Sequence, residues 1–165
     1  MGCIRFLLSP FAFLFGAVVM ALVVFIGFAV AISVMGMPKA YAGEGWLVSD
    51  TFAAILLGLT FVGAIAGTMV ARRMGGGLAT LLMMAFAAYI CLVPHADSPQ
   101  DASKSQRYAG RPESRPDNAG LVDLMRWSED PSWLRYGGAV VGITGAAIGA
   151  SLAKGRRKAS SSDDE

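Results

Sequence analysis

The sequence predicts an all-α integral membrane protein, a four-helix bundle with a long polar loop between helices 3 and 4. Apolar residues make up 55% of the chain and charged residues only 16%, against roughly a quarter in soluble proteins. Charges are absent from four mostly apolar stretches, at residues 6–38, 51–71, 74–94 and 136–153. Each stretch reaches the roughly 18 residues that a membrane-spanning helix needs. None shows the alternation typical of barrel strands, so helices are the expected form.

The first span is expected to run from Pro10 to Met35, with Ser9 as its N-cap and Pro10 as its first residue. Such a helix would be roughly 39 Å long and would tilt or protrude from the hydrocarbon core. Ala40 and Ala42 follow in an A-x-A arrangement like that of a signal-peptidase site. The apolar run is about twice as long as in an ordinary signal peptide, which favours a retained anchor over cleavage. The sequence alone leaves both outcomes open.

The second and third spans are joined by a short turn. The second span covers residues 51–71 after Ser49 or Asp50 as its N-cap, and the third ends at Pro94. Between them lies "RRMGGG", whose three glycines suit a tight helical hairpin. Residues 1–94 are therefore predicted to hold membrane helices 1–3.

Residues 95–130 are predicted to form an extracytoplasmic loop. The part before Leu121 is rich in Ser, Pro, Asp and Gly and is expected to be disordered on its own. Leu121, Leu124 and Met125 then recur at helical spacing, with Asp123 off their stripe. This pattern predicts a short amphipathic helix that lies at the membrane interface.

Membrane helix 4 is expected at residues 131–155, and a disordered cytoplasmic tail at residues 156–165. Four spans place both termini on one side of the membrane. On that side Lys and Arg are concentrated close to the spans, at Arg5, Arg72, Arg73, Lys154, Arg156, Arg157 and Lys158, and they are spread more thinly on the other. The positive-inside bias therefore predicts cytoplasmic termini. We expect the membrane to be a bacterial inner membrane.

Aromatic residues gather at the predicted outer boundary. Trp46, Trp127, Trp133 and Tyr136 are the expected interface anchors, and Tyr41 belongs to the same level. Amphipathic rings collect where the hydrocarbon meets the headgroups. These residues are therefore expected to share one membrane surface.

The second and fourth spans carry stripes of small residues. The predicted helix-packing residues are Gly63, Gly67, Gly138, Gly142, Gly145 and Gly149. Their spacings of three and four residues place each set on one helix face. Because lipid supplies no hydrophobic drive between helices, small residues favour association through close van der Waals contact. The partner is either a helix of this bundle or a helix of another chain.

Residues that could carry a reaction are scarce. The spans contain no charged side chain, which counts against a proton-coupled transporter. Their hydroxyls, at Ser33, Thr60, Thr68, Thr80, Tyr89, Thr144 and Ser151, are expected to bond within their own helices. His95 and Asp97 form the only nearby pair for catalysis, in a loop expected to be flexible. Cys3 and Cys91 are expected to be small apolar fillers.

Several classes of ligand leave no motif in this chain. Phosphate-binding, dinucleotide-binding and metal-binding patterns are absent from the sequence, so an enzyme is not expected. There is no dispersed basic surface with interleaved aromatics, which argues against nucleic acid. A pigment, quinone or lipid held only by packing would leave almost no sequence trace, so the cofactor stays unknown.

These observations predict an accessory, scaffolding or assembly subunit of a larger membrane protein complex. It would act through helix packing and an outer docking loop. Its partners would be the lipid bilayer and either other membrane subunits or further copies of itself. The alternative is an oligomeric pore, a holin-like protein or a transporter, since backbone carbonyls or several subunits can line a pore without charged residues.

Overall fold

The computed structural model describes residues 2–96, 111–116 and 118–159. Every regular element in this part of the chain is a helix: α1 (Gly2–Met35), α2 (Met37–Ala40), α3 (Asp50–Ala96), α5 (Leu121–Trp127) and α6 (Ser132–Ala159). Three of them contain stretches that are long and apolar enough to cross a membrane, namely Leu8–Met35, Asp50–Tyr89 and Ser132–Lys154. The predicted all-α class is therefore confirmed for this part of the chain, and three of its helices could cross a membrane. The predicted arrangement of four membrane helices in a bundle is not confirmed. The second and third predicted spans belong to one element, α3.

α1 begins before the residue predicted to start it. The helix spans 34 residues and contains Pro10 in its interior, so the prediction that Ser9 is its N-cap is wrong. Ser9 is fully buried and donates a 2.9 Å hydrogen bond to the carbonyl of Gly75 in α3. Its hydroxyl therefore serves a neighbouring helix instead of capping its own. At 1.5 Å per residue α1 is about 51 Å long, well beyond a hydrocarbon core of about 30 Å.

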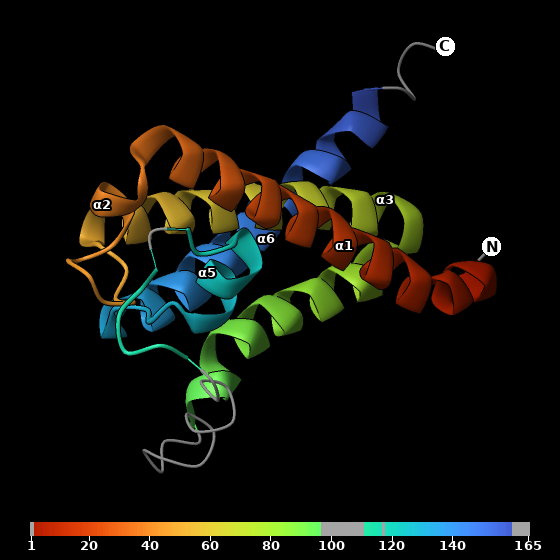
Figure 1. Cartoon of the computed structure of the whole chain (residues 1–165). Helices are drawn as coiled ribbons and strands as arrows, with labels where there is room; N and C mark the ends of the chain where they lie inside the picture. Colours follow the sequence, from red (N-terminus) through yellow and green to blue (C-terminus); the bar gives the residue numbers. More distant parts are fainter. Residues whose placement is uncertain (1, 97–110, 117, 160–165) are drawn as a thin grey trace.

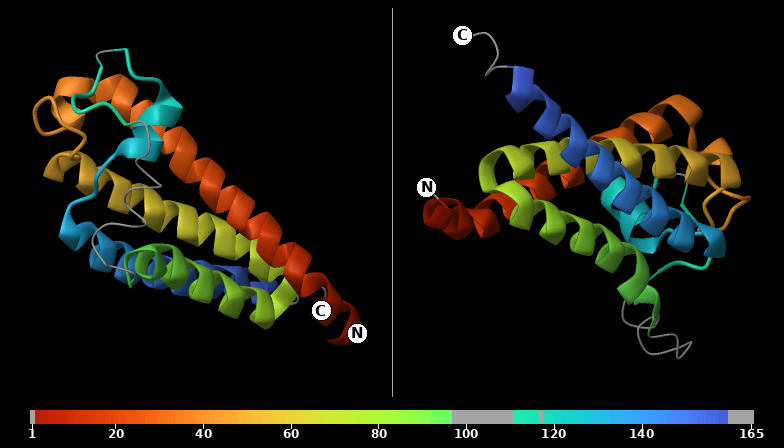
Figure 2. Two further views of the ribbon diagram at one scale, coloured as in Figure 1. Left: turned by 60° about the horizontal axis from the view of Figure 1, so that its bottom comes forward. Right: turned by 180° about the vertical axis from the view of Figure 1, so that it is seen from behind.

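α3 changes direction at a single residue. Gly76 has φ 73° and ψ −147°, which are not helical. Figures 1 and 2 show that the chain reverses there, so the first limb (residues 50–75) and the second limb (residues 77–96) form a hairpin. A Cβ added to Gly67 of the first limb would lie 3.1 Å from Met83 Cε of the second. The predicted reversal at "RRMGGG" is present, and one glycine makes it.

Small residues bring α1 and the first limb into backbone contact. A Cβ added to Gly16 would lie 2.6 Å from the Gly67 carbonyl oxygen, and one added to Gly67 would lie 2.5 Å from the Gly16 oxygen. Further along the same face, a Cβ on Gly75 would meet Ala12 Cβ at 2.6 Å and Ser9 Cα at 3.1 Å. Such small side chains permit the short interhelical distance on which packing in lipid depends.

The outward surfaces of the long helices are apolar. Exposed large side chains include Phe11, Leu14, Val18, Phe25 and Val30 on α1, Val62 and Leu81 on α3, and Val140, Ile143 and Leu152 on α6. Soluble proteins rarely expose a contiguous apolar surface of this extent. A membrane helix presents such side chains to the acyl chains of the lipids.

The two ends of the molecule are built from different elements. The beginning of α1, the kink of α3 and the end of α6 lie at one end, and α2 and α5 lie toward the other (Figures 1 and 2). Arg72 and Arg73 lie shortly before the kink, and Lys154 is near the end of α6. α6 continues to Ala159, so residues 156–159 are helical and not part of a tail.

Candidate functional site

Two segments far apart in the sequence form a cap over the end of α1 and the beginning of α3. One is the loop at residues 36–49, which contains α2. The other is the strap at residues 111–116 and 118–131, which contains α5. Val48 N–H donates to the Glu129 carbonyl at 3.0 Å, and Glu129 N–H donates to the Trp46 carbonyl at 2.8 Å. The strap is therefore joined to the loop through the main chain.

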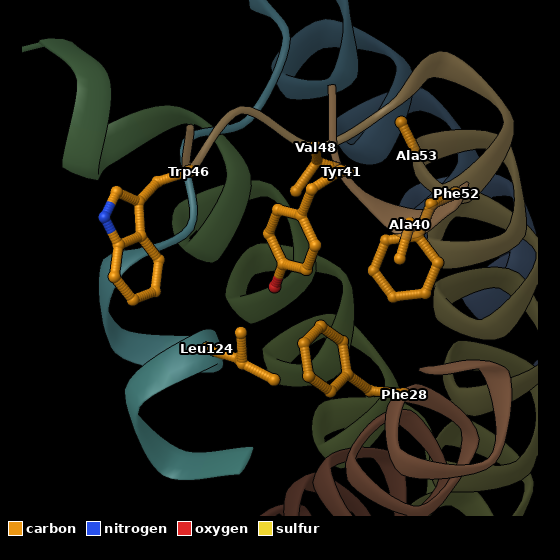
Figure 3. Packing of buried hydrophobic residues seen from close by; sticks show 8 residues of the cluster. All are labelled: Phe28, Ala40, Tyr41, Trp46, Val48, Phe52, Ala53 and Leu124. Carbon is orange, nitrogen blue, oxygen red and sulfur yellow. The ribbon is translucent and has the colours of Figure 1, made fainter. Parts of the chain in front are cut away.

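An apolar cluster fills the cap (Figure 3). Its buried members are Phe28, Ala40, Tyr41, Trp46, Val48, Phe52, Ala53 and Leu124. The ring centroids of Phe28 from α1 and Phe52 from α3 are 5.4 Å apart. Leu124 of α5 packs into the same cluster, and Figure 3 shows it beside Phe28. The cluster thus fixes α5 against both long helices. The helix predicted from the spacing of Leu121, Leu124 and Met125 is present, and its Leu124 side faces protein.

Arg115 binds the strap to the loop. Its guanidinium donates to the carbonyl oxygens of Gly45 at 2.8 Å and Gly43 at 3.3 Å. The same group lies 4.3 Å from the centre of the Tyr41 ring. Arg115 N–H donates to the Glu44 carbonyl at 3.0 Å. A planar guanidinium presents several N–H donors in one plane, so it can donate to two carbonyls while it lies over an aromatic ring.

Polar contacts also order the beginning of the strap, which was expected to be disordered on its own. Trp46 Nε1–H donates to the Pro112 carbonyl at 3.0 Å, and the Trp46 and Trp127 rings pack edge to face at 5.4 Å. Arg111 and Glu129 form an ion pair at 2.6 Å. Their side chains are 25% and 43% exposed, so this pair is expected to contribute at most about 1 kcal/mol.

We expect Arg115→Ala to open the cap. The substitution removes hydrogen bonds from a charged donor and a cation–π contact from a partly exposed side chain, so a net loss of about 2 kcal/mol in the opening free energy is expected. Hydrogen exchange at the amides of Val48 and Glu129 would report it. The control is Glu113→Ala, since Glu113 is exposed on the same segment. Unchanged protection in Arg115→Ala would contradict the assigned role.

Tyr41 is the buried polar group of the cap. Its side chain is 1% exposed, and its hydroxyl lies 2.8 Å from Ser128 Oγ. Because Ser128 Oγ donates its own proton to the Leu124 carbonyl, Tyr41 is the donor in this pair. Burial raises the pKa of Tyr41, and the positive charge of Arg115 opposes that rise.

The cap is expected to lose stability at high pH. Since the folded-state pKa of Tyr41 is raised above 10.0, its contribution is complete below pH 10 and is lost as the pH rises through the folded pKa. Tyrosinate absorbance of the parent, minus that of Tyr41→Phe, isolates this group from the other tyrosines. Titration of Tyr41 at or below its ordinary pKa would refute the expectation.

The predicted packing glycines of α6 lie against α3. A Cβ added to Gly145 would lie 2.8 Å from the Phe61 carbonyl oxygen, and one added to Gly149 would lie 3.0 Å from Ile65 Cα. Both neighbours belong to the first limb. These two helices therefore touch through main-chain atoms.

The other predicted packing glycines also contact neighbouring helices of this chain or are buried. A Cβ on Gly142 would lie 3.2 Å from Ala87 Cβ of the second limb. Gly63 and Gly67 face α1, and Gly138 is buried. Gly63, Gly67 and Gly142 therefore contact other helices of the same chain.

The four expected interface anchors fall into two groups. Trp133 is 42% exposed and donates through Nε1 to Asp50 Oδ1 at 3.1 Å, and Tyr136 is 71% exposed. Trp46 is only 3% exposed and Trp127 is partly buried, because they pack together inside the cap. Trp46 therefore faces protein where contact with headgroups was expected.

Most span hydroxyls bond one turn back in their own helix, as expected. Those of Ser33, Thr60, Thr80, Thr144 and Ser151 donate to carbonyls four residues earlier. Thr68 and Tyr89 differ from them. The Thr68 hydroxyl is buried with no hydrogen-bond partner among the described residues, and the side chain of Tyr89 is 59% exposed.

Gly16 and Arg115 are contact residues that the sequence analysis does not identify. Gly16 belongs to a stripe with Ser9 and Ala12, spaced by three and four residues, and this spacing was the available signal. Arg115 offered no comparable signal, because its carbonyl partners lie 70 and 72 residues away.

Reactive groups do not converge in the described part of the chain. Within it, no three His, Cys, Asp or Glu side chains lie close enough to hold a metal ion. Asp97, the tail at 160–165 and the side chains of Cys3, Cys91 and His95 lie outside the described residues. No family profile, curated protein or solved structure matches the chain.

Proposed function

We propose that this chain is an accessory, scaffolding or assembly subunit of a larger membrane protein complex. The observation that supports this best is that the long helices and the cap make their close contacts within the chain. The predicted packing glycines Gly63, Gly67, Gly142, Gly145 and Gly149 contact other helices of the chain. Arg115 and Trp46 donate hydrogen bonds to carbonyls of the cap. What remains outward is an apolar helix surface and a preformed cap, which suit binding more than chemistry.

The proposal includes four membrane crossings, with each limb of α3 crossing separately. The uncharged run between Asp50 and Arg72 would be about 31 Å long as a helix, close to the hydrocarbon thickness of about 30 Å. A straight helix over Asp50–Tyr89, which has 40 residues, would be about 60 Å long. The kink at Gly76 therefore makes two crossings compatible with one bilayer.

We also propose that the kinked end faces the cytoplasm of a bacterium and that the cap lies outside the inner membrane. Arg72, Arg73 and Lys154 are at the kinked end, and Lys and Arg are retained on the cytoplasmic side. In a variant with Cys3 and Cys91 replaced by alanine, Ser103→Cys should react with an impermeant thiol reagent from outside. Ser160→Cys should react only after permeabilisation, and the reverse pattern would invert the topology.

The function is tested by gentle detergent extraction followed by native mass spectrometry of what travels with the chain. Unlike subunits in fixed stoichiometry, together with failed assembly of that complex when this chain is deleted, are the expected result. A homo-oligomer without other subunits that passes ions in purified liposomes would instead support the pore alternative. The Arg115→Ala variant then shows whether the cap carries the partner contact.

A further inference from the structure

The apolar arc of α5 is wider than the part that the protein covers. Around the circumference of a 3.6-residue helix the order of positions is Trp127, Leu124, Leu121, Met125, Val122 and then Arg126. Leu124 is buried, and Leu121 and Trp127 pack against the same cluster. Val122 is 70% exposed and Met125 36% exposed. Two of the five apolar positions therefore face outward, and the exposed Arg126 lies next to them.

Contacts of α5 also define its depth along the bundle. Leu124 belongs to the same buried cluster as Phe28 and Phe52. Phe52 is two residues after Asp50, where the uncharged part of the first limb begins. Trp133, the exposed tryptophan, is hydrogen-bonded to Asp50. α1 continues past Phe28 to Met35. α5 therefore lies beside α1 at the level where the first limb would enter the membrane.

We propose that α5 is a lipid-binding edge, in which Val122 and Met125 enter the outer leaflet and Arg126 binds the phosphate of an anionic lipid. This assignment rests on the membrane crossings proposed above. An amphipathic helix at the interface buries its apolar arc at the boundary between headgroups and acyl chains, with basic residues along the margin. Arg126 holds this marginal position, with its guanidinium 5.9 Å from the Trp127 ring. The long stem of an arginine lets its charge reach the headgroups from an apolar surface.

The test places an environment-sensitive fluorophore at Val122→Cys in a chain whose Cys3 and Cys91 are replaced by alanine. The full chain is reconstituted in nanodiscs of phosphatidylcholine with or without phosphatidylglycerol, and lipids spin-labelled near the headgroup act as quenchers. We expect quenching at Val122→Cys at least about threefold greater than at Glu113→Cys, which is exposed on the same strap. Val18→Cys, on the exposed face of α1, reports insertion of the bundle itself.

The outcomes separate this proposal from the proposed function. A water-like probe at Val122 with a lipid-buried probe at Val18 overturns the lipid-binding edge alone. A shielded probe at Val122 that no lipid quenches also overturns it, because a protein would then cover the site. Water-like probes at both positions overturn the membrane crossings as well.

The role of Arg126 is tested in the same nanodiscs. Phosphatidylglycerol should increase quenching at Val122→Cys in the parent and in Arg126→Lys, but not in Arg126→Gln. An equal lipid response in all three would overturn the phosphate contact.

Discussion

Replacing Gly76 with alanine is expected to destabilise the hairpin of α3 by about 1–3 kcal/mol. The φ of 73° and ψ of −147° at this residue lie in a region that a Cβ makes sterically unfavourable. Alanine also favours a continuous helix over glycine by about 1 kcal/mol. The substitution therefore strains the hairpin and stabilises the straight helix that competes with it. The unfolding midpoint in mixed micelles and the elution volume of the purified protein would measure the effect.

Gly77→Ala is the matched control for this prediction. At both Gly76 and Gly77 an added Cβ would meet no heavy atom within 4 Å, and only Gly76 of the two has a positive φ. Gly77→Ala is therefore expected to leave the midpoint unchanged or slightly higher. Equal losses in the two variants would mean that the backbone conformation of Gly76 is not what makes the hairpin.

Gly67→Val is expected to push α1 away from the first limb and to lower the free energy of unfolding by about 3 kcal/mol or more. The nearest atom to the added Cβ is the Gly16 carbonyl oxygen at 2.5 Å. A main-chain atom cannot rotate away as a side chain can, so the helices themselves must move apart. Loss of monodisperse protein, or a large fall in the unfolding midpoint, is the expected observation.

Gly58→Val is the matched control. It makes the same change in helix propensity as Gly67→Val without forcing a side chain against another helix. Gly58 lies in the same limb, is exposed, and would place a Cβ within 4 Å of no other atom. Gly58→Val should therefore behave like the parent protein. A Gly67→Val protein that is as stable as Gly58→Val would show that α1 and α3 do not touch through their backbones in solution.

The helical architecture was predictable because it depends on local chemistry. A run without charges, such as residues 51–71, needs no distant partner to indicate a membrane helix. The reversal at Gly76 was equally local, since only glycine adopts its torsion angles readily. Even so, a local rule misplaced the start of α1, because Ser9 satisfies a carbonyl of another helix.

The cap could not be predicted in the same way. Arg115 and Trp46 find carbonyl partners that any residue could supply, so no side-chain pattern marks them in advance. The sequence predicts an interfacial position for Trp46, because tryptophan is common at membrane interfaces. In the structure the strap covers it, and nothing in the sequence near Trp46 indicates that the strap returns to this point.

Residues that meet in the cap are far apart in the sequence, so they are synthesised at different times. Trp46 and Pro112 are 66 residues apart, and Tyr41 and Ser128 are 87 apart. In the proposed topology, the loop would reach the outer side of the membrane before the strap is synthesised. Ala40, which is 0% exposed in the finished cap, would stay accessible until the strap arrives and the cap closes.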